Sequence, residues 1–370
     1  MGDEKTKGLI GTARTYASFV KLSHTVFALP FALASMAAAY AVPTQFIYVS
    51  QAPGNLPRGG SFDQHVPFSW VTLLLILACM VGARSFAMAV NRILDRKIDA
   101  LNPRTAMREI PAGRLSLPAA WGFAVASAAV YWAACALLGN VVLWLSPIPI
   151  ALMLLYPFTK RVSALCHLFL GASLGLAPVG AWIAVRGMGP HHTGISNRGG
   201  EWTNLGWRGD LFPADAIWRG IEWSAVSELS PWLLGGAVML WVAGFDVIYA
   251  LQDDEFDRQQ KLHSIPVALG RRRALWVSRL MHFASAALFF AFIYVLTHPV
   301  ALANGMDVTQ YTQFANWVWV APCVMVAGMA YQHSLVKTDD LSRVNMAFFT
   351  VNGVISVVFG VTFILAHLLA

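Results

Sequence analysis

Two aspartate clusters of the same spacing stand far apart in a mostly apolar chain of 370 residues. The first contains Asp95 and Asp99, and the second contains Asp253 and Asp257. Carboxylates four positions apart lie one helical turn apart on the same face, where their oxygens can converge on shared cations. Such hard oxygen ligands, beside an amide such as Asn91, suit Mg²⁺ better than zinc or copper. Each cluster therefore predicts half of a Mg²⁺ site.

Basic side chains accompany both clusters. Mg²⁺ in proteins is usually held by one or two carboxylates together with substrate phosphates, and guanidinium groups bind phosphate oxygens well. An acidic and basic loop taken alone is usually a solvated connector, and a Lys-Arg pair alone can be a membrane anchor. Two matched clusters with flanking arginines instead indicate a clamp for a diphosphate. The basic candidates for this clamp are Arg84, Arg104, Arg108, Arg114, Lys160 and Arg161.

An internal repeat connects the two clusters. When Asp95 is aligned with Asp253, Asn91 falls on Tyr249, and an Ile-Pro pair follows each cluster at 110–111 and 265–266. Each half has the order helix, acidic cluster, basic loop, Ile-Pro turn and next helix. The repeat predicts two loops that face each other over one cavity.

The composition predicts the elements that must position these loops. The chain is 57% hydrophobic and only 12% charged, whereas soluble domains carry about 25% charged residues. The apolar runs are continuous and lack the alternation of a membrane β-barrel. We expect an all-α polytopic membrane protein, a single domain over residues 1–370 with about nine transmembrane helices in one bundle around a central cavity. The expected spans are 22–41, 68–94, 117–138, 141–158, 163–185, 231–252, 274–297, 316–333 and 345–368.

The net charge of +7 is explained by topology. With the N-terminus in the cytoplasm, most of the Lys and Arg residues fall on the cytoplasmic side, together with both aspartate clusters. This agrees with the positive-inside rule and gives no reason to expect a nucleic-acid partner. We expect an integral protein of a bacterial cytoplasmic membrane, with the lipid bilayer as its surroundings and the acidic loops on the cytoplasmic side. The Lys and Arg residues on the opposite side are Arg58, Arg186, Arg198, Arg208 and Arg219.

Two segments, 42–67 and 187–230, interrupt the bundle on the outer side. Both are rich in loop-forming residues, and the second carries several tryptophans that suit a short helix at the membrane–water interface. We interpret both as loop insertions without a chemical motif. The first span is long, and its removal would reverse the topology, so we expect no cleaved signal peptide. The four cysteines all fall within expected spans and predict neither a disulfide framework nor a metal site.

The motifs resemble the UbiA superfamily of intramembrane aromatic prenyltransferases, most closely its 4-hydroxybenzoate polyprenyltransferase branch. The first family motif matches Asn91-Arg-x-x-Asp95-x-x-x-Asp99-x-x-Asn102-Pro-Arg104-Thr. The second matches Asp246-Val-Ile-Tyr249-Ala-Leu-Gln-Asp253-x-x-x-Asp257 with Leu-His-Ser-Ile-Pro after it, and a shorter third matches Tyr156-x-x-x-Lys160. Residues 23–31 resemble the first helix of this branch. The resemblance is dense from about residue 20 to 280 and loose over the last two helices, and the 187–230 insertion departs from the family pattern.

The resemblance implies nine transmembrane helices around a cavity that is capped by the two acidic loops. It implies transfer of a polyprenyl chain from a polyprenyl diphosphate to the ring of an aromatic acid acceptor, ortho to a hydroxyl. Mg²⁺ would be held by Asp95, Asp99, Asp253 and Asp257, oriented by Asn91. Leaving-group oxygens would be neutralised by Arg104, Arg108, Lys160 and Arg161. Tyr156 and Tyr249 would steady the cation or the diphosphate, and Arg84 would pair with an acceptor carboxylate.

The sequence leaves the acceptor open. The first hypothesis is 4-hydroxybenzoate, for ubiquinone biosynthesis, and the second is a dihydroxynaphthoate, for menaquinone biosynthesis by the futalosine route. A different class, a transporter with a duplicated acidic site, is less consistent with the sequence. Transporter acids usually lie near the bilayer midplane within broken helices, whereas these lie at helix ends among arginines. Prenyl chain length and oligomeric state are not predicted.

Overall fold

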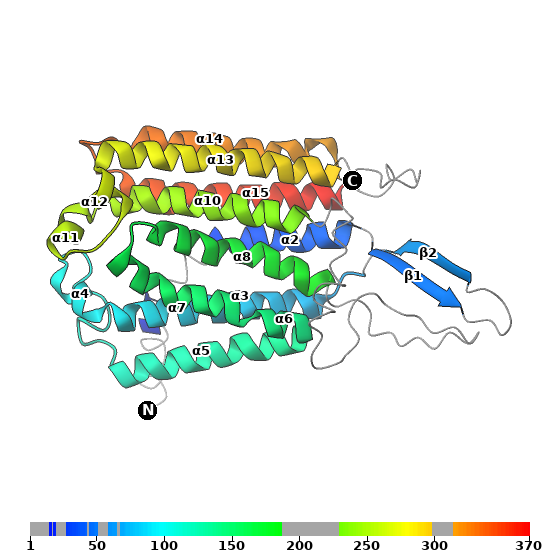
Figure 1. Cartoon of the computed structure of the whole chain (residues 1–370), viewed down its shortest axis with the longest axis horizontal. Coiled ribbons are helices and arrows are strands. Elements are labelled where there is room, and N and C mark those ends of the chain that lie inside the picture. Colours follow the sequence, from blue (N-terminus) through cyan, green and yellow to red (C-terminus); the bar gives the residue numbers. More distant parts are fainter. Residues whose placement is uncertain are drawn as a thin grey trace, which may run out of the picture.

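The molecule is a bundle of long helices, and three short helices, α4, α11 and α12, lie together at one end (Figure 1). The computed structural model describes residues 15–16, 18–19, 27–42, 44–50, 58–64, 67–186, 229–297 and 314–370. The elements in chain order are α2 Leu29–Ala41, β1 Thr44–Ser50, β2 Arg58–Gln64, α3 Trp70–Leu94, α4 Arg96–Leu101, α5 Leu117–Leu138, α6 Asn140–Leu145, α7 Pro147–Val162, α8 Cys166–Arg186, α10 Ser230–Ala250, α11 Asp254–Gln259, α12 Ile265–Leu269, α13 Arg271–Thr297, the 3-10 helix η4 Asn316–Trp319, α14 Val320–Leu335, the π-helix η5 Met346–Val351 and α15 Asn352–Leu368.

The predicted helical membrane class is confirmed. Among the described residues, seven helical segments are long and apolar enough to cross a membrane. They are Trp70–Leu94, Leu117–Leu138, Asn140–Val162, Cys166–Arg186, Ser230–Ala250, Arg271–Thr297 and Met346–Leu368. The first and eighth expected spans appear as shorter helices, α2 with 13 residues and α14 with 16. The expected total of nine transmembrane helices therefore stays a prediction.

Serine and proline residues set several helix starts. The Ser69 hydroxyl accepts a hydrogen bond from the Thr72 amide at 3.2 Å, at the start of α3. The Ser116 hydroxyl accepts one from the Ala119 amide at 3.4 Å, and a proline follows it in the first turn of α5. A serine cap satisfies an amide that would otherwise lack a partner, and proline has no amide hydrogen to lose. These residues therefore fix where the long helices begin.

Small residues allow α8 and α10 to pack at close range. A methyl group on Gly171 or Gly175 of α8 would overlap backbone carbonyls of α10. On α10, a methyl group on Gly235 would lie 2.7 Å from the Gly175 carbonyl oxygen. Small residues four positions apart are a common device for such contacts between membrane helices. This contact fixes the relative position of two helices that line the functional pocket.

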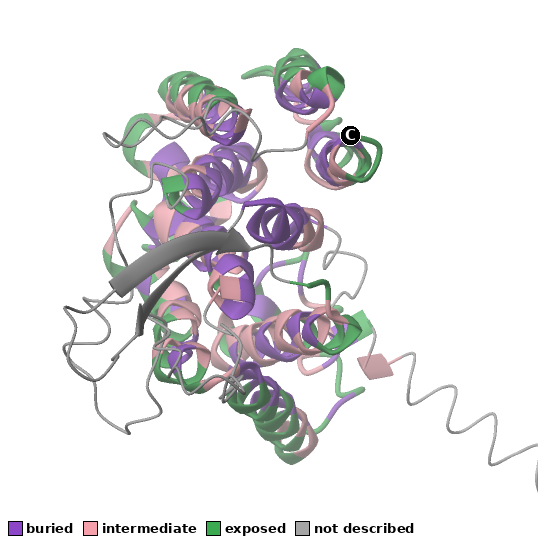
Figure 2. Ribbon diagram, turned by 90° about the vertical axis from the view of Figure 1, so that its right-hand side faces the viewer, coloured by how far each residue is buried: buried purple, intermediate pink, exposed green. Residues whose placement is uncertain are grey.

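The bundle has a buried interior and an apolar exterior. Buried residues turn inward and exposed residues outward in the end-on view (Figure 2). Helices α2 and α10 contribute much of the core, including Phe31, Trp241 and Phe245. Large apolar side chains such as Phe283 and Leu137 are exposed on the outer surface. An apolar exterior of this extent suits lipid rather than water.

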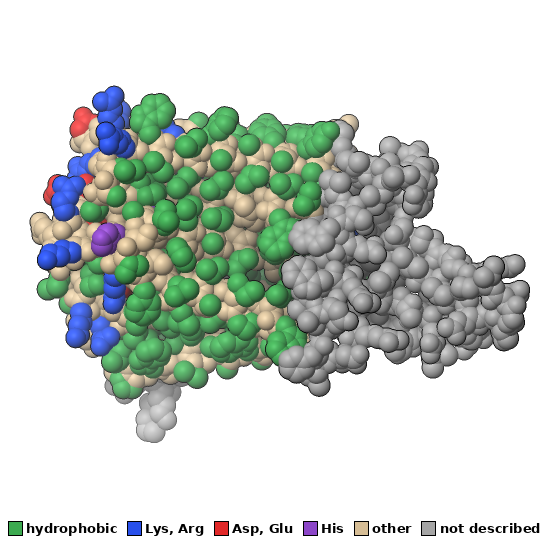
Figure 3. Space-filling view, in the orientation of Figure 1, with side chains coloured by type: hydrophobic (Ala, Val, Ile, Leu, Met, Phe, Trp, Pro, Cys, Tyr) green, Lys and Arg blue, Asp and Glu red, His purple; other side chains and the backbone are tan. Residues whose placement is uncertain are grey.

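Charged side chains gather at the end of the bundle that carries α4, α11 and α12, whereas apolar side chains cover its flank (Figure 3). The opposite end carries a two-stranded antiparallel hairpin in which Phe46 pairs with Phe62 (Figure 1). This hairpin lies within the predicted insertion 42–67, for which the sequence predicted only a loop. The predicted interfacial helix within 187–230 lies outside the described residues, apart from the last residues of that segment. The assignment of residues 1–370 to one domain stays a prediction.

Candidate active site

Two short helices present the aspartate clusters in the same way. Asp95 joins α3 to α4 with φ −89° and ψ 3°, and Asp253 precedes α11 with φ −109° and ψ 5°. In each half the amide of the second aspartate donates to the carbonyl of the first. The N···O distance is 2.8 Å for Asp99 and 2.7 Å for Asp257. The predicted one-turn spacing is confirmed, and the two halves share one local geometry.

The later part of the repeat differs between the halves. Ile265 and Pro266 begin the helix α12, which the Ser264 hydroxyl caps by accepting from the Val267 amide at 3.4 Å. The corresponding Ile110 and Pro111 lie in a series of turns. The structural repeat is therefore closest at the aspartates themselves.

The two loops meet, as the repeat predicts. From the first loop, the Asn102 side-chain amide donates to Asp253 Oδ1 at 3.2 Å, and Arg104 Nε donates to the same oxygen at 2.9 Å. The Asn102 side-chain oxygen in turn accepts from the Arg104 backbone amide at 2.9 Å. Asn102 therefore positions Arg104 and connects it to the second cluster.

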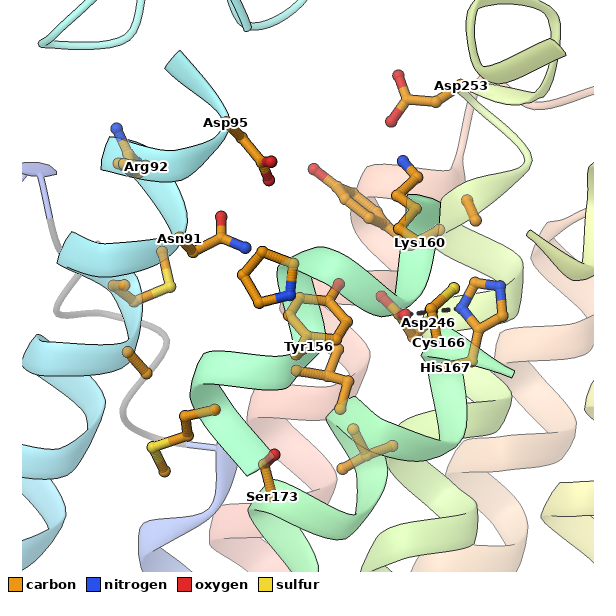
Figure 4. Close-up of a pocket in the computed structure, with 18 of the residues that line it drawn as sticks. Asn91, Arg92, Asp95, Tyr156, Lys160, Cys166, His167, Ser173, Asp246 and Asp253 are labelled. Carbon is orange, nitrogen blue, oxygen red and sulfur yellow. Dashed lines mark hydrogen bonds and ion pairs between the residues drawn. The ribbon is translucent and has the colours of Figure 1, made fainter. Parts of the chain in front are cut away.

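One cavity of about 340 Å³ lies beneath these loops. Figure 4 shows Asp95 and Asn91 on one wall and Asp253 and Lys160 on the opposite side, with Tyr156 below and between them. Twelve of the predicted site residues line this cavity, so the structure brings these twelve together. They are Arg84, Asn91, Asp95, Asp99, Arg104, Arg108, Tyr156, Lys160, Arg161, Tyr249, Asp253 and Asp257. Arg114, a further candidate for the clamp, is not among the lining residues and donates to the Met107 carbonyl.

Each of the four aspartates forms an ion pair with one basic side chain of the pocket. The pairs are Asp95 with Arg161 at 3.0 Å, Asp99 with Arg108 at 2.8 Å, Asp257 with Lys160 at 2.9 Å, and Asp253 with Arg104. The sequence predicted both sets of residues but not these pairings. In the protein without ligands, the carboxylates predicted to bind a metal are therefore neutralised by the basic residues predicted to bind a diphosphate.

Arg84 differs from the other basic residues of the pocket. It lies within α3, about two turns before Asn91, and its Nε atom is buried without a hydrogen-bond partner among the described residues. No acidic side chain of the described chain forms an ion pair with it. An uncompensated guanidinium in a buried pocket is an expected binding site for an anionic group.

Burial makes the negative charge of two carboxylates costly. Burial raises the pKa of Asp95, and the hydrogen bond from Arg161 offsets this only in part. Burial also raises the pKa of Asp257 against the opposing charge of Lys160. Asp257 Oδ2 is buried and has no hydrogen-bond partner among the described residues. A divalent cation would relieve both costs, so these hard oxygen donors fit such a metal.

The expected convergence of carboxylates is not formed. In the described part of the chain, no three His, Cys, Asp or Glu side chains are close enough together to hold a metal ion. Asp95 and Asp253 face each other across the cavity and do not form one cluster (Figure 4). The ion pairs explain this, because each carboxylate turns to its own basic partner. The donor set suits a metal that takes further oxygens from a substrate, rather than one enclosed by protein ligands alone.

A buried ion pair anchors the first loop. Arg92 of α3 pairs with Glu109, and both side chains are 4% exposed. The Ser18 hydroxyl also donates to Glu109 at 2.6 Å. Burial opposes the charge of Glu109, but the bond from Ser18, its own backbone amide and Arg92 together lower its pKa. No role for Arg92 or Glu109 was predicted from the sequence, although Arg92 also lines the cavity.

Aromatic rings form one wall of the cavity. The Tyr249 hydroxyl accepts a hydrogen bond from Arg104 at 2.7 Å, and Arg104 lies 5.1 Å from the centre of its ring. The Phe348 ring is 4.1 Å from the Tyr249 ring, centre to centre, and Phe349 packs edge-on at 5.8 Å. Both phenylalanines lie in the π-helix Met346–Val351. π-Helices are rare in proteins as a whole, and those that occur are often found at functional sites. Periodicity alone would assign these phenylalanines to packing.

A further acid–base pair lies deeper in the pocket. His167 Nδ1 is 2.7 Å from Asp246 Oδ2, and both residues line the cavity. Figure 4 shows this pair below Lys160. Asp246 belongs to the second motif, but no role for it was predicted from the motif. The available signal was its place within an apolar span, where ionisable residues usually mark function.

Comparison with known proteins identifies the family. The sequence model of the UbiA prenyltransferase family matches residues 59–354. The chain belongs to this family. The predicted recognition is therefore confirmed, and the chain is an enzyme that transfers alkyl groups other than methyl.

Relatives and solved structures of the UbiA family agree with this assignment. A 4-hydroxybenzoate octaprenyltransferase of Serratia proteamaculans is 28% identical over 66% of this chain and 74% of its own length. One from Idiomarina loihiensis is 24% identical over 75% of this chain and 78% of its length. The apo structure of a UbiA homolog from Aeropyrum pernix K1 is 32% identical, with a TM-score of 0.63 over 92% of this chain and 97% of that one. A UbiA homolog from Archaeoglobus fulgidus, bound to GPP and Mg²⁺, shares the fold at 16% identity, with a TM-score of 0.59 over 95% of this chain and 99% of that one.

Proposed function

We propose that this prenyltransferase moves a polyprenyl chain from a polyprenyl diphosphate to the ring of 4-hydroxybenzoate, ortho to the hydroxyl. The observation that supports this most directly is the set of four acid–base pairs around one cavity at the end of an apolar bundle. A diphosphate with a divalent metal needs acidic ligands for the metal and basic ligands for the phosphates. The cavity lining supplies both.

We assign the metal to Mg²⁺, with Asp95, Asp99, Asp253 and Asp257 as its protein ligands and Asn91 as an orienting amide. The oxygen-only donor set supports this choice, as does the Mg²⁺ in the related Archaeoglobus structure. When bound, the metal stabilises negative charge on the departing diphosphate. Arg104, Arg108, Lys160 and Arg161 exchange their carboxylate partners for phosphate oxygens as the donor binds. Because phosphate oxygens replace the carboxylates, none of these cations is left buried without a counter-charge in the bound complex.

Aromatic side chains face the reacting carbon of the donor. Tyr249 holds Arg104 through its hydroxyl while its ring, with Phe348, forms an apolar wall that excludes water. An electron-rich ring face also stabilises a neighbouring cation. Tyr156, one turn before Lys160, lies in the cavity between the two walls (Figure 4). Together these rings favour capture of the allylic cation by the acceptor over capture by water.

Arg84 binds the carboxylate of the acceptor. It is the basic lining residue without an acidic partner in the described chain, so a bound carboxylate supplies the missing charge. The names of the relatives support an aromatic acid. We place the protein in a bacterial cytoplasmic membrane with its acidic loops on the cytoplasmic side, because the charged end of the bundle is rich in Lys and Arg (Figure 3).

The direct test incubates purified protein in detergent with Mg²⁺, geranyl diphosphate and 4-hydroxybenzoate, and detects prenylated product by mass spectrometry. We expect a ring-prenylated product that disappears when EDTA removes the metal and returns when Mg²⁺ is restored. A parallel reaction with a dihydroxynaphthoate tests the second acceptor. Product from the naphthoate alone would reassign the acceptor. If neither acid is prenylated and the protein moves a solute in liposomes, the proposed function is wrong.

A further inference from the structure

The Asp246–His167 pair has a geometry that suits proton transfer. The Ile265 backbone amide donates to His167 Nε2 at 3.3 Å. Since Nε2 accepts, the ring proton is on Nδ1, and Nδ1 donates to Asp246 Oδ2 at 2.7 Å. The imidazole is therefore neutral and fully hydrogen-bonded. Its role is to orient the carboxylate, which carries the charge.

The second carboxylate oxygen faces the cavity. Asp246 lines the pocket, and no described residue donates a hydrogen bond to Oδ1. Within the described membrane-spanning helices, Asp246 is also the one acidic residue. A carboxylate within a membrane-spanning helix is energetically unfavourable, so its presence usually indicates a function. The helix geometry places Asp246 seven residues, or roughly 10 Å, deeper along the bundle than Asp253.

This depth separates Asp246 from the aspartates at the mouth of the cavity. The acids there already have basic partners suited to a diphosphate, whereas Asp246 has a neutral hydrogen-bond donor. The lining around it includes Cys166, Ser173 and Tyr156. A weakly polar pocket of this kind suits an aromatic ring that carries one hydroxyl.

We propose that Asp246, oriented by His167, is the general base that takes the hydroxyl proton of the aromatic acceptor. This inference rests on the proposed function, because it requires a phenolic acceptor. Loss of the proton turns the hydroxyl into a strong electron donor and raises the nucleophilicity of the ortho carbon. Asp246 is thus a catalytic residue, and His167 is a positioning residue.

The step balances without a further reagent. The ortho carbon of the ring bonds to the allylic carbon, the allylic carbon–oxygen bond breaks, and the diphosphate leaves with that electron pair. The hydroxyl proton moves to Asp246 Oδ1, which gives a cyclohexadienone with one extra hydrogen on the alkylated carbon. That hydrogen leaves as a proton to the diphosphate, its bonding pair restores the aromatic ring, and Asp246 returns its proton to the oxygen.

The test compares Asp246→Asn with wild type on acceptors of increasing hydroxyl acidity: 4-hydroxybenzoate, 3-fluoro-4-hydroxybenzoate and 3-nitro-4-hydroxybenzoate. Asparagine still accepts from His167 but is not basic. We expect kcat/KM for 4-hydroxybenzoate to fall ~10²–10³-fold, in the range of general-base catalysis. For 3-nitro-4-hydroxybenzoate, whose hydroxyl is already ionised in solution, the wild-type to variant ratio of kcat/KM should be less than ~10-fold. His167→Ala should show a smaller loss with the same trend.

The wild-type to variant ratio of kcat/KM distinguishes a general base from a structural residue, because a structural defect lowers kcat/KM equally for all acceptors. An equal ratio across the series overturns the proposal. Donor binding, measured with geranyl diphosphate and Mg²⁺, should match wild type in the variant. A wild type that prenylates no phenolic acid refutes the proposed function instead.

A measurement on wild type alone covers the case in which Asp246→Asn does not fold. The methyl ether 4-methoxybenzoate has no hydroxyl proton to give. We expect it to inhibit competitively against 4-hydroxybenzoate and to yield no product. Prenylation of the ether at a rate close to that of 4-hydroxybenzoate would overturn the proposal.

Discussion

At the scale of single residues, the pocket is organised by pairs of opposite charge. Removing one member of a pair leaves its partner buried without a counter-charge. This destabilises the fold by more than the net stability that the intact pair contributes. Substitutions at the aspartates therefore affect both the protein alone and the bound complex. The most informative changes keep the shape of the side chain.

The first prediction concerns Asp253, which accepts from both Asn102 and Arg104. Asp253→Asn should lower kcat ~10³-fold or more, because it removes a metal ligand and a contact between the two loops. Steady-state prenylation with saturating Mg²⁺ measures this. Glu255→Gln is the matched control, since Glu255 lies two residues away with its side chain 82% exposed. Equal activity of the two variants would contradict the assignment.

A second prediction concerns Arg84. Arg84→Gln should raise KM for 4-hydroxybenzoate ~10-fold or more and leave KM for the diphosphate unchanged, because the lost charge-assisted bond serves the acceptor. Phenol, which lacks the carboxylate, provides the comparison. If wild type and Arg84→Gln differ as much on phenol as on 4-hydroxybenzoate, Arg84 does not bind the carboxylate.

At the scale of elements, helix packing holds the catalytic side chains in register. The closeness of α8 and α10 places His167 beside Asp246, although the two residues are 79 positions apart. Because of that separation, the pair could not be predicted from the sequence. The two aspartates of each cluster could be predicted, because they are only four positions apart.

A third prediction tests this contact with a matched pair of variants on α8. Gly175→Ala should lower the melting temperature and the activity, because the added methyl group overlaps the Gly235 carbonyl and costs ~1–3 kcal/mol. Gly180→Ala should be neutral or slightly stabilising, since nothing lies within 4 Å of the added atom and alanine favours helices. Thermal unfolding in detergent measures both. Equal melting temperatures would show that the contact is not tight.

A fourth prediction concerns the anchor between α3 and the first loop. Because the pKa of Glu109 is lowered from its ordinary 4.5, its contribution to stability is present above that value and is lost as pH falls through the lowered pKa. Glu109→Gln should lose ~3 kcal/mol near neutral pH, as it leaves Arg92 unpaired. The difference from wild type should shrink in acid, as measured by melting temperature against pH. A difference that is constant with pH would exclude Glu109 as the source.

At the scale of the whole molecule, one end of the bundle carries charge and the rest presents apolar surface. The sequence predicted this division well, because long apolar runs and basic loops are local signals. Twelve of the residues that line the cavity were also predicted from the sequence. The sequence did not predict which base pairs with which acid, since the pairing of Arg161 with Asp95 depends on how α7 packs beside α3. The hairpin within 42–67 was missed because its composition resembles that of a loop.

A fifth prediction tests the orientation of the molecule. In a variant without native cysteines, Glu255→Cys should react with a membrane-impermeant maleimide only from the cytoplasmic side. Trp70→Cys, at the opposite end of α3 and 70% exposed in wild type, should react only from the other side. Labelling of intact and inverted vesicles measures this, and the reverse pattern would show that the acidic loops face outward.

The π-helix before α15 has a consequence for insertions and deletions. Its hydrogen bonds span five residues instead of the four of an α-helix, so this short segment acts as one inserted residue and shifts the angular position of every residue that follows by roughly 100°. Deleting one residue between 346 and 351 would let the segment relax to a regular α-helix. Either the two phenylalanines would then rotate off the cavity wall, or the buried face of α15, including Phe359 and Phe363, would rotate out of the core. Chain length in this segment is therefore expected to be constrained more tightly than amino-acid identity.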